Sequence, residues 1–462
     1  MSWNNYHRIY FIGIGGIGMS ALARYFYAMG LEVAGYDRTE TSLTTQLQLE
    51  GMSIHFEDNL ELVPSQVLQD NKGSLIVYTP AVPADHKELN FFREANYTVL
   101  KRSEVLGLIT KGNFTIAVAG THGKTTTSSI IAHLLKECNR SFTAFLGGLA
   151  NNFNSNFIQH HGQGEPVILV EADEYDRSFL KLFPNVAVVT STDPDHLDIY
   201  GAEDELKNGF KEFIKNIDSK GTLVVHEKLG ELSDTATSEV VTYGINRGQF
   251  FANNISTKDG FFVFDLYANN STFRSLKLGV PGFYNIENAI AALAVMEAIG
   301  EDFSKMQEAL TSFTGVKRRF EFVLRGETLV FIDDYAHHPE EIRSFLTSVR
   351  ELYPERELVV IFQPHLFSRT RDFALGFAES LSLADHILLL DIYPAREFPI
   401  EGINSEMLLS LIKSKNKQLV SKEFILNEFQ PAQGAVVATI GAGDIDKLVK
   451  PLQHKWSYEK NI

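Results

Sequence analysis

The stretch Ala119–Thr127 constrains the fold of this chain more than any other part of the sequence. It contains Ala-Gly-Thr-His-Gly-Lys-Thr-Thr-Thr. An apolar run that is typical of a buried strand, Phe114–Ala119, precedes it, and a run that can be helical, Thr126–Glu137, follows it. A strand, a glycine-rich turn, Lys-Thr and a helix form a phosphate-binding loop, because the first N–H groups of the helix and its dipole attract an anion. We therefore predict an α/β fold with phosphate bound at this turn.

Within the loop, Lys124 can reach the outer phosphates of a nucleotide, and the hydroxyl of Thr125 can hold a phosphate-bound Mg²⁺. The common phosphate loop has another glycine five residues before Gly123, where this chain has Val118. The loop is therefore two residues shorter than usual. The residues that we expect to contact the nucleotide are Gly120, Thr121, His122, Gly123, Lys124, Thr125 and Thr126.

A second glycine-rich turn, Gly13–Gly18, follows the apolar strand Arg8–Ile12 and precedes a helical run. Its G-x-G-x-x-G spacing, with Asp37 further on, is that of a dinucleotide fingerprint. Physically, the pattern predicts a diphosphate at a helix start and an acid near a ribose, so NAD and a UDP-linked sugar both fit. A further strand, Ser74–Tyr78, ends at Thr79, and open α/β sheets bind ligands at such strand ends.

Acidic residues follow two apolar runs after the phosphate loop. Val167–Val170 continues directly into Glu171, and Val186–Thr190 precedes a segment in which His196 lies among aspartates. A carboxylate at the end of a buried strand beside a phosphate loop is a Mg²⁺ ligand position, so Glu171 is a candidate ligand. His196 is equally consistent with a surface histidine paired to a neighbouring acid.

The next segment changes in character. Residues 240–281 alternate apolar and polar side chains between glycine and asparagine turns, which predicts antiparallel hairpins. Asn285 and Asn288 then open a helix, Ala289–Ile299. A helix cap explains one asparagine, but two on the same face indicate contact with a nucleotide.

Polar residues also follow the strands of the last part of the chain. Leu329–Ile332 runs into Asp333–Pro339, and Leu358–Phe362 runs into Gln363-Pro364-His365. Further strands alternate with helices, which predicts a third doubly wound sheet. Downstream, Arg369 could grip a carboxylate or phosphate, or could be a surface cation.

The length of 462 residues and the three series of strands predict domains at 1–106, 107–314 and 315–462. The net charge of −16 argues against a nucleic-acid partner. The single cysteine, Cys138, suits a reducing compartment. The sequence has no signal peptide and no apolar run of the ~18 residues that a membrane span needs, so we expect a cytoplasmic protein without a membrane partner.

The order of these motifs resembles the Mur ligase family, the ATP-dependent amide-forming enzymes of peptidoglycan synthesis. The short loop Gly120–Thr125 is similar to that family's own phosphate loop. Further residues fall in the family's order, namely Glu171, His196, Asn285, Asn288, Arg319 and Asp334. The resemblance implies three α/β domains: a Rossmann-like UDP-binding domain, a central domain with a P-loop ATPase-type sheet, and a Rossmann-like C-terminal domain.

Within the family, three features resemble the members that join L-alanine to the carboxylate of UDP-N-acetylmuramate. They are Gly-Ile-Gly-Gly-Ile-Gly-Met-Ser from Gly13, the Asp333–Pro339 stretch, and Gln363-Pro364-His365 with Ser368–Asp372. Members that attach a preformed tripeptide to the same UDP-sugar share the first feature and much of the second, but differ in the third. The tripeptide ligases are therefore the alternative within the family.

The resemblance also implies roles for individual residues. It places the UDP-sugar at Gly13, Gly15, Gly16, Gly18, Met19, Ser20, Asp37 and Thr79. It places ATP at the phosphate loop and at Asn285, Asn288, Arg319 and Asp334. It assigns magnesium to Thr125, Glu171 and His196. It implies that the residues acting in catalysis are Lys124, His196, His337, His365 and Arg369.

The implied substrates are ATP, UDP-N-acetylmuramate and L-alanine, with Mg²⁺ as cofactor and a monomer or weak homodimer as the working form. An NAD-dependent dehydrogenase is the alternative from another enzyme class, argued from Gly13–Gly18 and Asp37. It leaves Gly120–Thr127 unexplained. A third alternative is a nucleotide-binding switch that catalyses no reaction. Such a protein has no use for a UDP-sugar.

Overall fold

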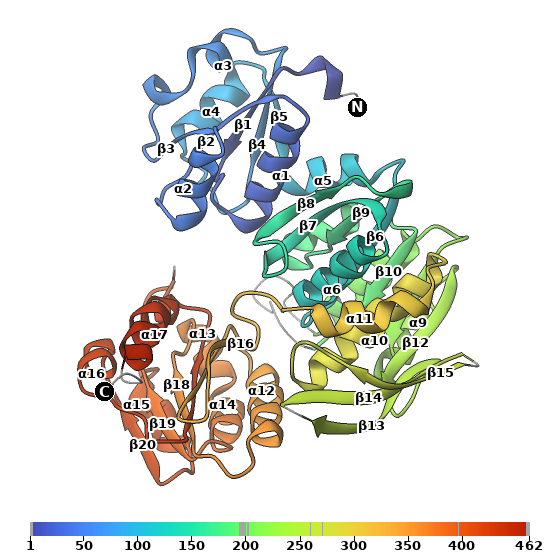
Figure 1. Cartoon of the computed structure of the whole chain (residues 1–462). Helices are drawn as coiled ribbons and strands as arrows, with labels where there is room; N and C mark the ends of the chain where they lie inside the picture. Colours follow the sequence, from blue (N-terminus) through green and yellow to red (C-terminus); the bar gives the residue numbers. More distant parts are fainter. Residues whose placement is uncertain are drawn as a thin grey trace. The chain divides into compact units, whose positions relative to one another are not determined.

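The computed structural model contains three sheets that follow one another along the chain, in the blue, green-to-yellow and orange-to-red parts of Figure 1. It describes residues 3–193, 200, 203–258, 260–269, 271–395 and 397–458. The predicted α/β class with three sheets is confirmed. The chain forms two compact units: Met1–Ala252 with Leu266–Thr272 and Asn288–Leu310, and Asn253–Asp265 with Phe273–Glu287 and Thr311–Ile462. The predicted boundaries at 106/107 and 314/315 stay predictions.

The first sheet has five parallel strands in the order β3-β2-β1-β4-β5. Its strands are β1 (Arg8–Ile12), β2 (Glu32–Tyr36), β3 (Ser53–His55), β4 (Ser74–Tyr78) and β5 (Thr98–Lys101). Its helices are α1 (Ile17–Ala28), α2 (Ser42–Leu49), α3 (Ser65–Gln69), α4 (Lys87–Glu94) and α5 (Arg102–Thr110). The strand order reverses between β1 and β4, and such a switch point is where open α/β sheets bind ligands.

The second sheet has ten strands in the order β15-β14-β13-β12-β11-β10-β6-β9-β7-β8. The first five in the chain are β6 (Phe114–Ala119), β7 (Arg140–Ala150), β8 (Ser155–His160), β9 (Gln163–Glu171) and β10 (Val186–Val189). The others are β11 (Thr222–His226), β12 (Glu239–Ile245), β13 (Phe250–Lys258), β14 (Phe261–Ala268) and β15 (Ser271–Lys277). The helices are α6 (Lys124–Glu137), α8 (Glu203–Lys215), α9 (Gly230–Ser233), α10 (Phe283–Ala298) and α11 (Met306–Ser312). The strand order reverses between β6 and β10.

The prediction of antiparallel hairpins over 240–281 is wrong for the pair β12 and β13, which is parallel. Asn246 and Gly248 both adopt positive φ, 65° and 114°. The short connection between the two strands can therefore change direction twice. As a result, Phe250 pairs with Tyr243, and β13 runs in the same direction as β12. Alternation of side chains alone does not distinguish the two directions of pairing.

The third sheet has six strands in the order β16-β17-β21-β18-β19-β20, with only β16 paired antiparallel. The strands are β16 (Glu321–Arg325), β17 (Val330–Asp334), β18 (Leu358–Phe362), β19 (His386–Leu389), β20 (Asn416–Leu419) and β21 (Val436–Ile440). The helices are α12 (Pro339–Leu352), α13 (Phe367–Asp372), α14 (Ala374–Leu381), α15 (Ser405–Leu411), α16 (Lys422–Asn427) and α17 (Val449–Tyr458). Strands β17, β18 and β21 are buried throughout, as expected of parallel strands covered on both faces.

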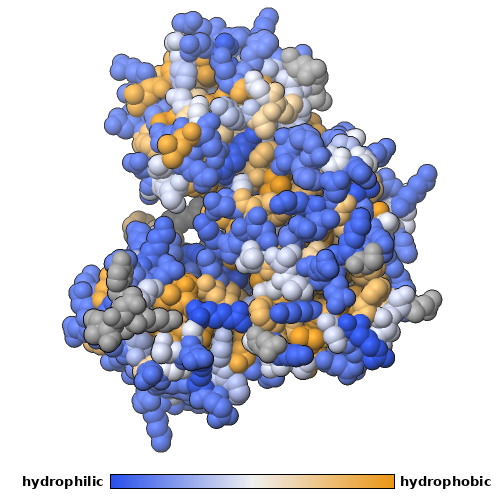
Figure 2. Space-filling model, viewed as in Figure 1, coloured by the Kyte–Doolittle hydropathy of each residue, from blue (hydrophilic) through white to orange (hydrophobic). Residues whose placement is uncertain are grey.

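One apolar core joins the first sheet to the second. It includes Phe11 and Leu22 from the first sheet and its helix α1, and Phe145 and Val170 from the second sheet. Hydrophilic residues cover most of the face shown in Figure 2, in keeping with the net charge of −16. Among the described residues, every helix is too short or too polar to cross a membrane.

Candidate active site

The phosphate loop lies at the carboxyl end of β6, and α6 begins at Lys124, two residues earlier than predicted. Gly120 and Gly123 both adopt positive φ, 134° and 81°, so the turn depends on glycine at these two positions. A side chain on Gly123 would place its Cβ 2.6 Å from Oδ1 of Asn288. The turn therefore aims the first N–H groups of α6 at the space beyond β6.

Lys124 is held by three acceptor oxygens from two residues. Its Nζ donates to the carbonyl of Gly120 at 2.6 Å and to both carboxylate oxygens of Glu174, at 2.9 and 2.8 Å. Burial alone would lower the pKa of Lys124, but the carboxylates of Glu174, Asp173 and Glu171 outweigh it and raise that pKa above its ordinary value. The lysine is therefore a permanent cation. Sequence reasoning missed Glu174, because the acid cluster after β9 does not show which carboxylate turns inward.

Thr125 and Glu171 form the candidate metal position. The hydroxyl of Thr125 donates to Oε1 of Glu171 at 3.0 Å, and the N–H of Gly147 donates to Oε2 at 2.8 Å. Burial raises the pKa of Glu171, and the charge of Lys124 opposes that rise. A hydroxyl and a carboxylate are the hard oxygen donors that Mg²⁺ prefers, and Mg²⁺ commonly completes its shell with substrate phosphates and water.

The rest of the predicted metal set is less defined. No group of three or more His, Cys, Asp or Glu side chains suited to a metal occurs in the described part of the chain. His196 lies outside the described residues, so its roles stay predictions. Thr125 and Glu171 fit a metal bound mainly through the nucleotide.

The end of β10 braces the phosphate loop. The hydroxyl of Ser191 accepts from the N–H of His122 at 2.8 Å and lies 2.9 Å from the hydroxyl of Thr121. The hydroxyl of Thr190 donates to the carbonyl of Ala119 at 3.2 Å. Thr190 and Ser191 were not predicted, since a Thr-Ser pair after a strand is common and only the pairing of β10 with β6 gives it this role.

Of the two predicted asparagines, Asn288 lies at the phosphate-loop helix. Its Oδ1 accepts from the hydroxyl of Thr127 at 3.1 Å. Asn285 belongs to the other compact unit and donates to the carbonyl of Pro281 at 2.6 Å. Both side chains are buried. Contact of Asn285 with the nucleotide stays a prediction.

The first glycine turn is closely packed against its own sheet. Oδ2 of Asp37 accepts from the N–H of Gly15 at 2.8 Å. A Cβ on Gly13 would lie 2.5 Å from the Thr79 side chain, and a Cβ on Gly18 would lie 2.5 Å from Nη1 of Arg102. The switch point thus brings the predicted residues of the first domain together.

Other predicted contacts of the UDP-sugar face the protein interior. Met19 and Ser20 are fully buried, and the hydroxyl of Ser20 accepts from the side-chain amide of Asn156. Gly16, by contrast, is exposed and precedes α1 in an extended conformation. Any contact of Met19 or Ser20 with a ligand in this arrangement would use backbone atoms, and the contacts stay predictions.

A cavity of about 200 Å³ joins the start of α1 to the second sheet. It is lined by Gly18 at the helix start, by Arg102, and by Gly147, Glu171 and Asp173 near the phosphate loop. Nη2 of Arg102 donates to Asp173 at 3.1 Å. The candidate diphosphate site and the candidate metal ligand Glu171 therefore open on one shared space.

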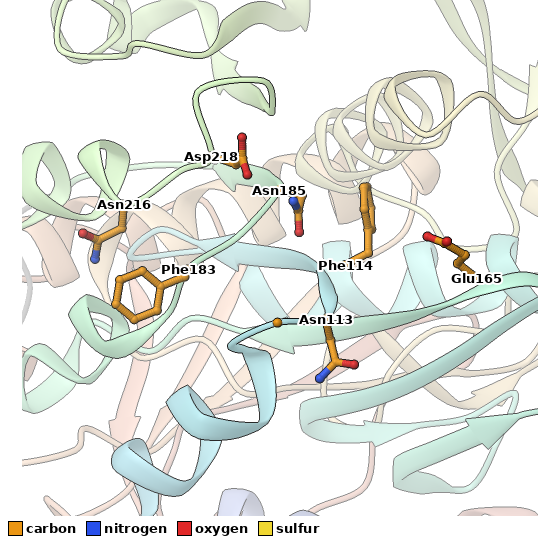
Figure 3. Close-up of a pocket in the computed structure, with 8 residues that line it drawn as sticks. Asn113, Phe114, Glu165, Phe183, Asn185, Asn216 and Asp218 are labelled. Carbon is orange, nitrogen blue, oxygen red and sulfur yellow. The ribbon is translucent and has the colours of Figure 1, made fainter. Parts of the chain in front are cut away.

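A larger cavity, of about 550 Å³, lies at the amino ends of β6 and β10, opposite the end that carries the phosphate loop (Figure 3). Phe114 and Asn185, which line it, mark the beginnings of β6 and β10, whereas the phosphate loop follows the other end of β6. Oδ1 of Asn185 accepts from the N–H of Thr115, and Asn216 donates to the carbonyl of Leu180. The side-chain amides of Asn185 and Asn216 thus stabilise the fold, and we assign this cavity no part in the reaction.

The third sheet gathers the predicted residues after β17. Asp334 is buried, and its two oxygens accept from the N–H groups of Phe320 and Ala336, at 2.7 and 2.8 Å. Burial raises the pKa of Asp334 to about 7, against the opposing charge of Arg319. The guanidinium of Arg319 lies over the Tyr335 ring at 5.1 Å.

The histidines meet at the same edge of the third sheet. The rings of His337 and His365 are 6.3 Å apart, and His365 stacks on Tyr393 at 5.8 Å. Nδ1 of His337 lies 3.0 Å from the carbonyl of Tyr335. Arg369 lies on the short helix α13 that follows His365. These predicted residues therefore all follow the carboxyl ends of β17 and β18. Their roles in catalysis stay predictions.

Models of known families match almost the whole chain. The Mur ligase family, catalytic domain, matches residues 8–113; the Mur ligase middle domain matches 118–296; and the Mur ligase, glutamate ligase domain, matches 318–445.

Among similar proteins, UDP-N-acetylmuramate–L-alanine ligase of Flavobacterium psychrophilum is 51% identical over 97% of this chain and 98% of its own length. That of Flavobacterium johnsoniae is 48% identical over 98% of each chain. The crystal structure of UDP-N-acetylmuramate-alanine ligase from Thermotoga maritima superposes with a TM-score of 0.83 at 29% identity, covering 98% of this chain and 99% of that one. A murein peptide ligase from Psychrobacter arcticus shares the fold, with a TM-score of 0.70 at 22% identity and 99% coverage of each chain.

Proposed function

The chain belongs to the Mur ligase family, and from that premise we propose that it joins L-alanine to the carboxylate of UDP-N-acetylmuramate with ATP. The observation that supports this most is the shared cavity, which Gly18 of the first glycine turn and Glu171 beside the phosphate loop both line. A UDP-linked sugar anchored at the first turn can extend through this space toward the γ-phosphate of ATP.

The reaction needs ATP because a carboxylate oxygen is a poor leaving group. The carboxylate oxygen of the sugar attacks the γ-phosphorus of ATP, which forms an acyl phosphate and releases ADP. The amine of L-alanine, having lost a proton, then attacks the acyl carbon. Inorganic phosphate leaves with the former carboxylate oxygen, and the amide bond remains.

Lys124 stabilises the charge on the phosphoryl group during the first step. Its cation lies at the start of α6, held between Glu174 and the carbonyl of Gly120. When the γ-phosphate binds, one of its oxygens would take the place of a Glu174 oxygen as an acceptor, because three oxygens already engage the three N–H groups of Nζ. Thr125 and Glu171 would hold Mg²⁺, which supplies further positive charge to the phosphates.

The third sheet contributes the remaining groups. Asp334 and Arg319 contact the ribose and phosphates of the nucleotide, and His337, His365 and Arg369 orient the amino acid and the acyl phosphate. Stacking on Tyr393 restricts the orientation of the His365 ring, which supports such a role. The reaction takes place in the cytoplasm, where ATP is available.

One assay tests the proposal. ADP release is measured with MgATP and every combination of UDP-N-acetylmuramate with L-alanine, glycine, L-serine and the tripeptide L-alanyl-D-glutamyl-diaminopimelate. Release should be fast only when UDP-N-acetylmuramate and L-alanine are both present. Hydrolysis indifferent to either substrate would overturn the proposal, and a preference for the tripeptide would favour the recycling alternative.

The dehydrogenase alternative is not favoured. It explains the turn after β1 but gives no role to the cluster of Lys124, Glu171 and Glu174 beside the phosphate loop. A titration with NADH, followed by nicotinamide fluorescence, should show no saturable binding.

A further inference from the structure

Asn156, on β8 of the second sheet, is fully buried and makes all of its described side-chain hydrogen bonds to α1 of the first sheet. Its Nδ2 donates to the carbonyl of Ile17 at 2.6 Å and to the hydroxyl of Ser20 at 2.9 Å. Its Oδ1 accepts from Nη1 of Arg24. One amide thus spans two turns of α1, starting from the turn that follows Gly16.

Arg24 is itself fixed. Its Nε donates to Oε2 of Glu50 at 2.8 Å, and its Nη2 donates to Oε1 at 2.8 Å. A two-pronged contact between a guanidinium and a carboxylate restricts orientation as well as distance. The acceptor side of Asn156 is therefore held by a buried cation that cannot rotate freely.

The other end of this connection reaches the phosphate loop. β8 pairs antiparallel with β7, and the N–H of Gly147 on β7 donates to Glu171. Glu171 in turn accepts from Thr125 at the start of α6. A series of contacts therefore connects the phosphate loop to the helix that begins at the first glycine turn: the hydrogen bonds of Glu171, the pairing of β7 with β8, whose register shifts between Phe145 and Ala150, and the side chain of Asn156.

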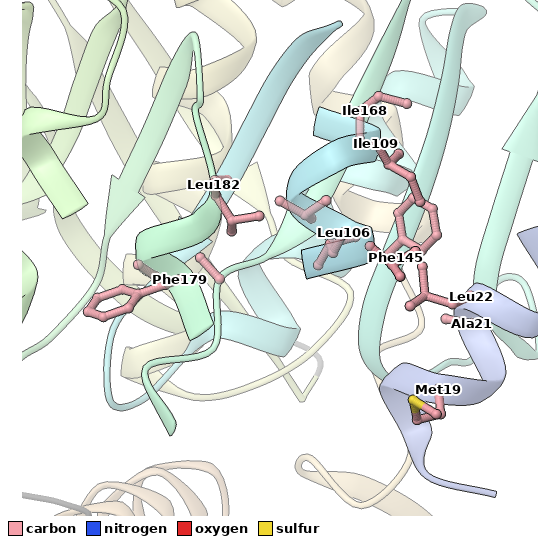
Figure 4. Packing of buried hydrophobic residues seen from close by; sticks show 14 of the residues in the cluster. Met19, Ala21, Leu22, Leu106, Ile109, Phe145, Ile168, Phe179 and Leu182 are labelled. Atoms are coloured by element: carbon pink, nitrogen blue, oxygen red, sulfur yellow. The ribbon is translucent and has the colours of Figure 1, made fainter. Parts of the chain in front are cut away.

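Apolar contacts accompany this series but do not set its geometry. Figure 4 shows Leu22 of α1 beside Phe145 of β7, and the ring of Tyr25 lies 5.4 Å from that of Phe145. Hydrophobic contacts are non-directional, so they hold α1 against β7 without fixing its rotation. The amide of Asn156, with two donors and one acceptor engaged, supplies the directional part.

We propose that Asn156 is a positioning residue that aligns the diphosphate-binding start of α1 with the phosphate loop. The inference rests on the proposed function, in which a carboxylate carried by the UDP-sugar must meet the γ-phosphate of ATP. A small rotation of α1 moves that carboxylate out of line, while ATP still binds normally to its own loop.

The test compares Asn156→Asp with Gln159→Ala. Asn156→Asp keeps the size of the side chain and its acceptor for Arg24, but turns the donor that faces Ile17 into an acceptor. Gln159 carries the same amide on the same strand and is exposed, so it is the matched control.

Asn156→Asp should raise the KM for UDP-N-acetylmuramate and lower kcat, with a combined loss of kcat/KM of roughly ten- to a hundred-fold. The KM for MgATP should stay within about two-fold of the wild-type value, since the phosphate loop is untouched.

A second measurement does not depend on turnover. Hydrogen–deuterium exchange should become faster at the first two turns of α1 in Asn156→Asp and stay unchanged in α6. Uniformly faster exchange, or an equal loss for both substrates, would show a general folding defect and overturn the positioning role. Kinetics of Asn156→Asp equal to those of the wild type would also overturn it.

If the wild-type protein itself fails to release ADP with UDP-N-acetylmuramate and L-alanine, the proposed function fails, and the exchange experiment still decides the role of Asn156. If Asn156→Asp does not fold, Arg24→Met takes its place, with the same expected KM-against-kcat pattern.

Discussion

A buried cation and its carboxylate partner define the phosphate loop at the scale of single residues. The side chain of Glu174 is 1% exposed and that of Lys124 is 14% exposed, so both charges are largely removed from water. Such a pair adds little net stability, because desolvation offsets the attraction, but removing one partner leaves the other charge buried alone. The pair is better understood as a device that holds Nζ where a phosphate can reach it.

Lys124→Ala should therefore have two separable effects. It should lower kcat/KM for MgATP by at least a hundred-fold, the size seen when a group that stabilises transition-state charge is removed. It should also destabilise the fold by about 3–5 kcal/mol, because Glu174 is left uncompensated. The double variant Lys124→Ala/Glu174→Gln should recover much of the stability and none of the activity. Steady-state kinetics and thermal melting measure both effects.

Lys136→Ala is the matched control, since Lys136 is exposed near the end of the same helix. It should leave both measurements unchanged. Near-normal turnover in Lys124→Ala would exclude the lysine as a phosphate ligand.

Glu88 makes the stability of the first sheet depend on pH. It is fully buried and accepts from the hydroxyl of Tyr10 at 2.7 Å and from the N–H of Asn59 at 3.1 Å. Burial raises its pKa from 4.5 to about 7. Between these values the folded protein keeps a proton that the unfolded chain releases, so the free energy of unfolding falls as pH rises from about 4.5 to about 7.

Glu88→Gln removes this titration while keeping an acceptor for Tyr10. From pH 5 to pH 8, the wild-type protein should lose about 2–3 kcal/mol more stability than the variant. Urea unfolding at the two pH values measures the difference. Glu61→Gln changes an exposed glutamate of the same region and should follow the wild type. Parallel pH profiles for wild type and Glu88→Gln would show that Glu88 is ionised in the folded protein.

Gly123 supports the turn of the phosphate loop, at the scale of the structural element. A substitution there meets two obstacles: a φ of 81°, and Asn288 only 2.6 Å from the new Cβ. Gly112 has a similar φ of 86° but nothing within 4 Å of a Cβ, so Gly112→Ala measures the backbone strain alone. Gly123→Ala should raise the KM for MgATP at least ten-fold beyond any effect of Gly112→Ala, because the N–H groups of α6 must shift. Equal effects of the two substitutions would mean that Asn288 yields to the methyl group.

Sequence patterns predicted the elements well where a motif determines the local backbone. The phosphate loop, the first glycine turn and strands such as β1, β4 and β18 lie where the glycine spacing and apolar runs placed them. The parallel direction of β13 could not be predicted, because strand direction is decided by the connection and not by alternation. Glu174, Ser191 and Asn156 were missed for a related reason. Each acts on a part of the chain that only tertiary packing brings near it.

Each sheet of the whole molecule presents some of its predicted site residues at the carboxyl ends of parallel strands, at or beside a change in strand order. Gly13 and Thr79 flank the switch point of the first sheet, and the phosphate loop and Thr190 flank that of the second. In the third sheet, Asp334 ends β17, next to β21. The same physical rule thus yields three sites, and what differs between them is the chemistry of the residues after each strand.

The net charge of −16 adds a property that no single site has. A phosphate ligand approaches a negative molecule and is captured only close to Lys124 and the N–H groups of the loop. Salt screens the long-range repulsion, since the Debye length falls from about 30 Å at 0.01 M to about 8 Å at 0.15 M ionic strength. Salt weakens contacts within a few ångströms of a buried cation much less.

The kcat/KM for MgATP should therefore rise by a small factor as KCl increases over this range. L-alanine, which carries no net charge, is the control substrate, and its kcat/KM should stay nearly constant. A steep fall in kcat/KM for MgATP with salt would instead mean that exposed cations outside the phosphate loop attract the nucleotide.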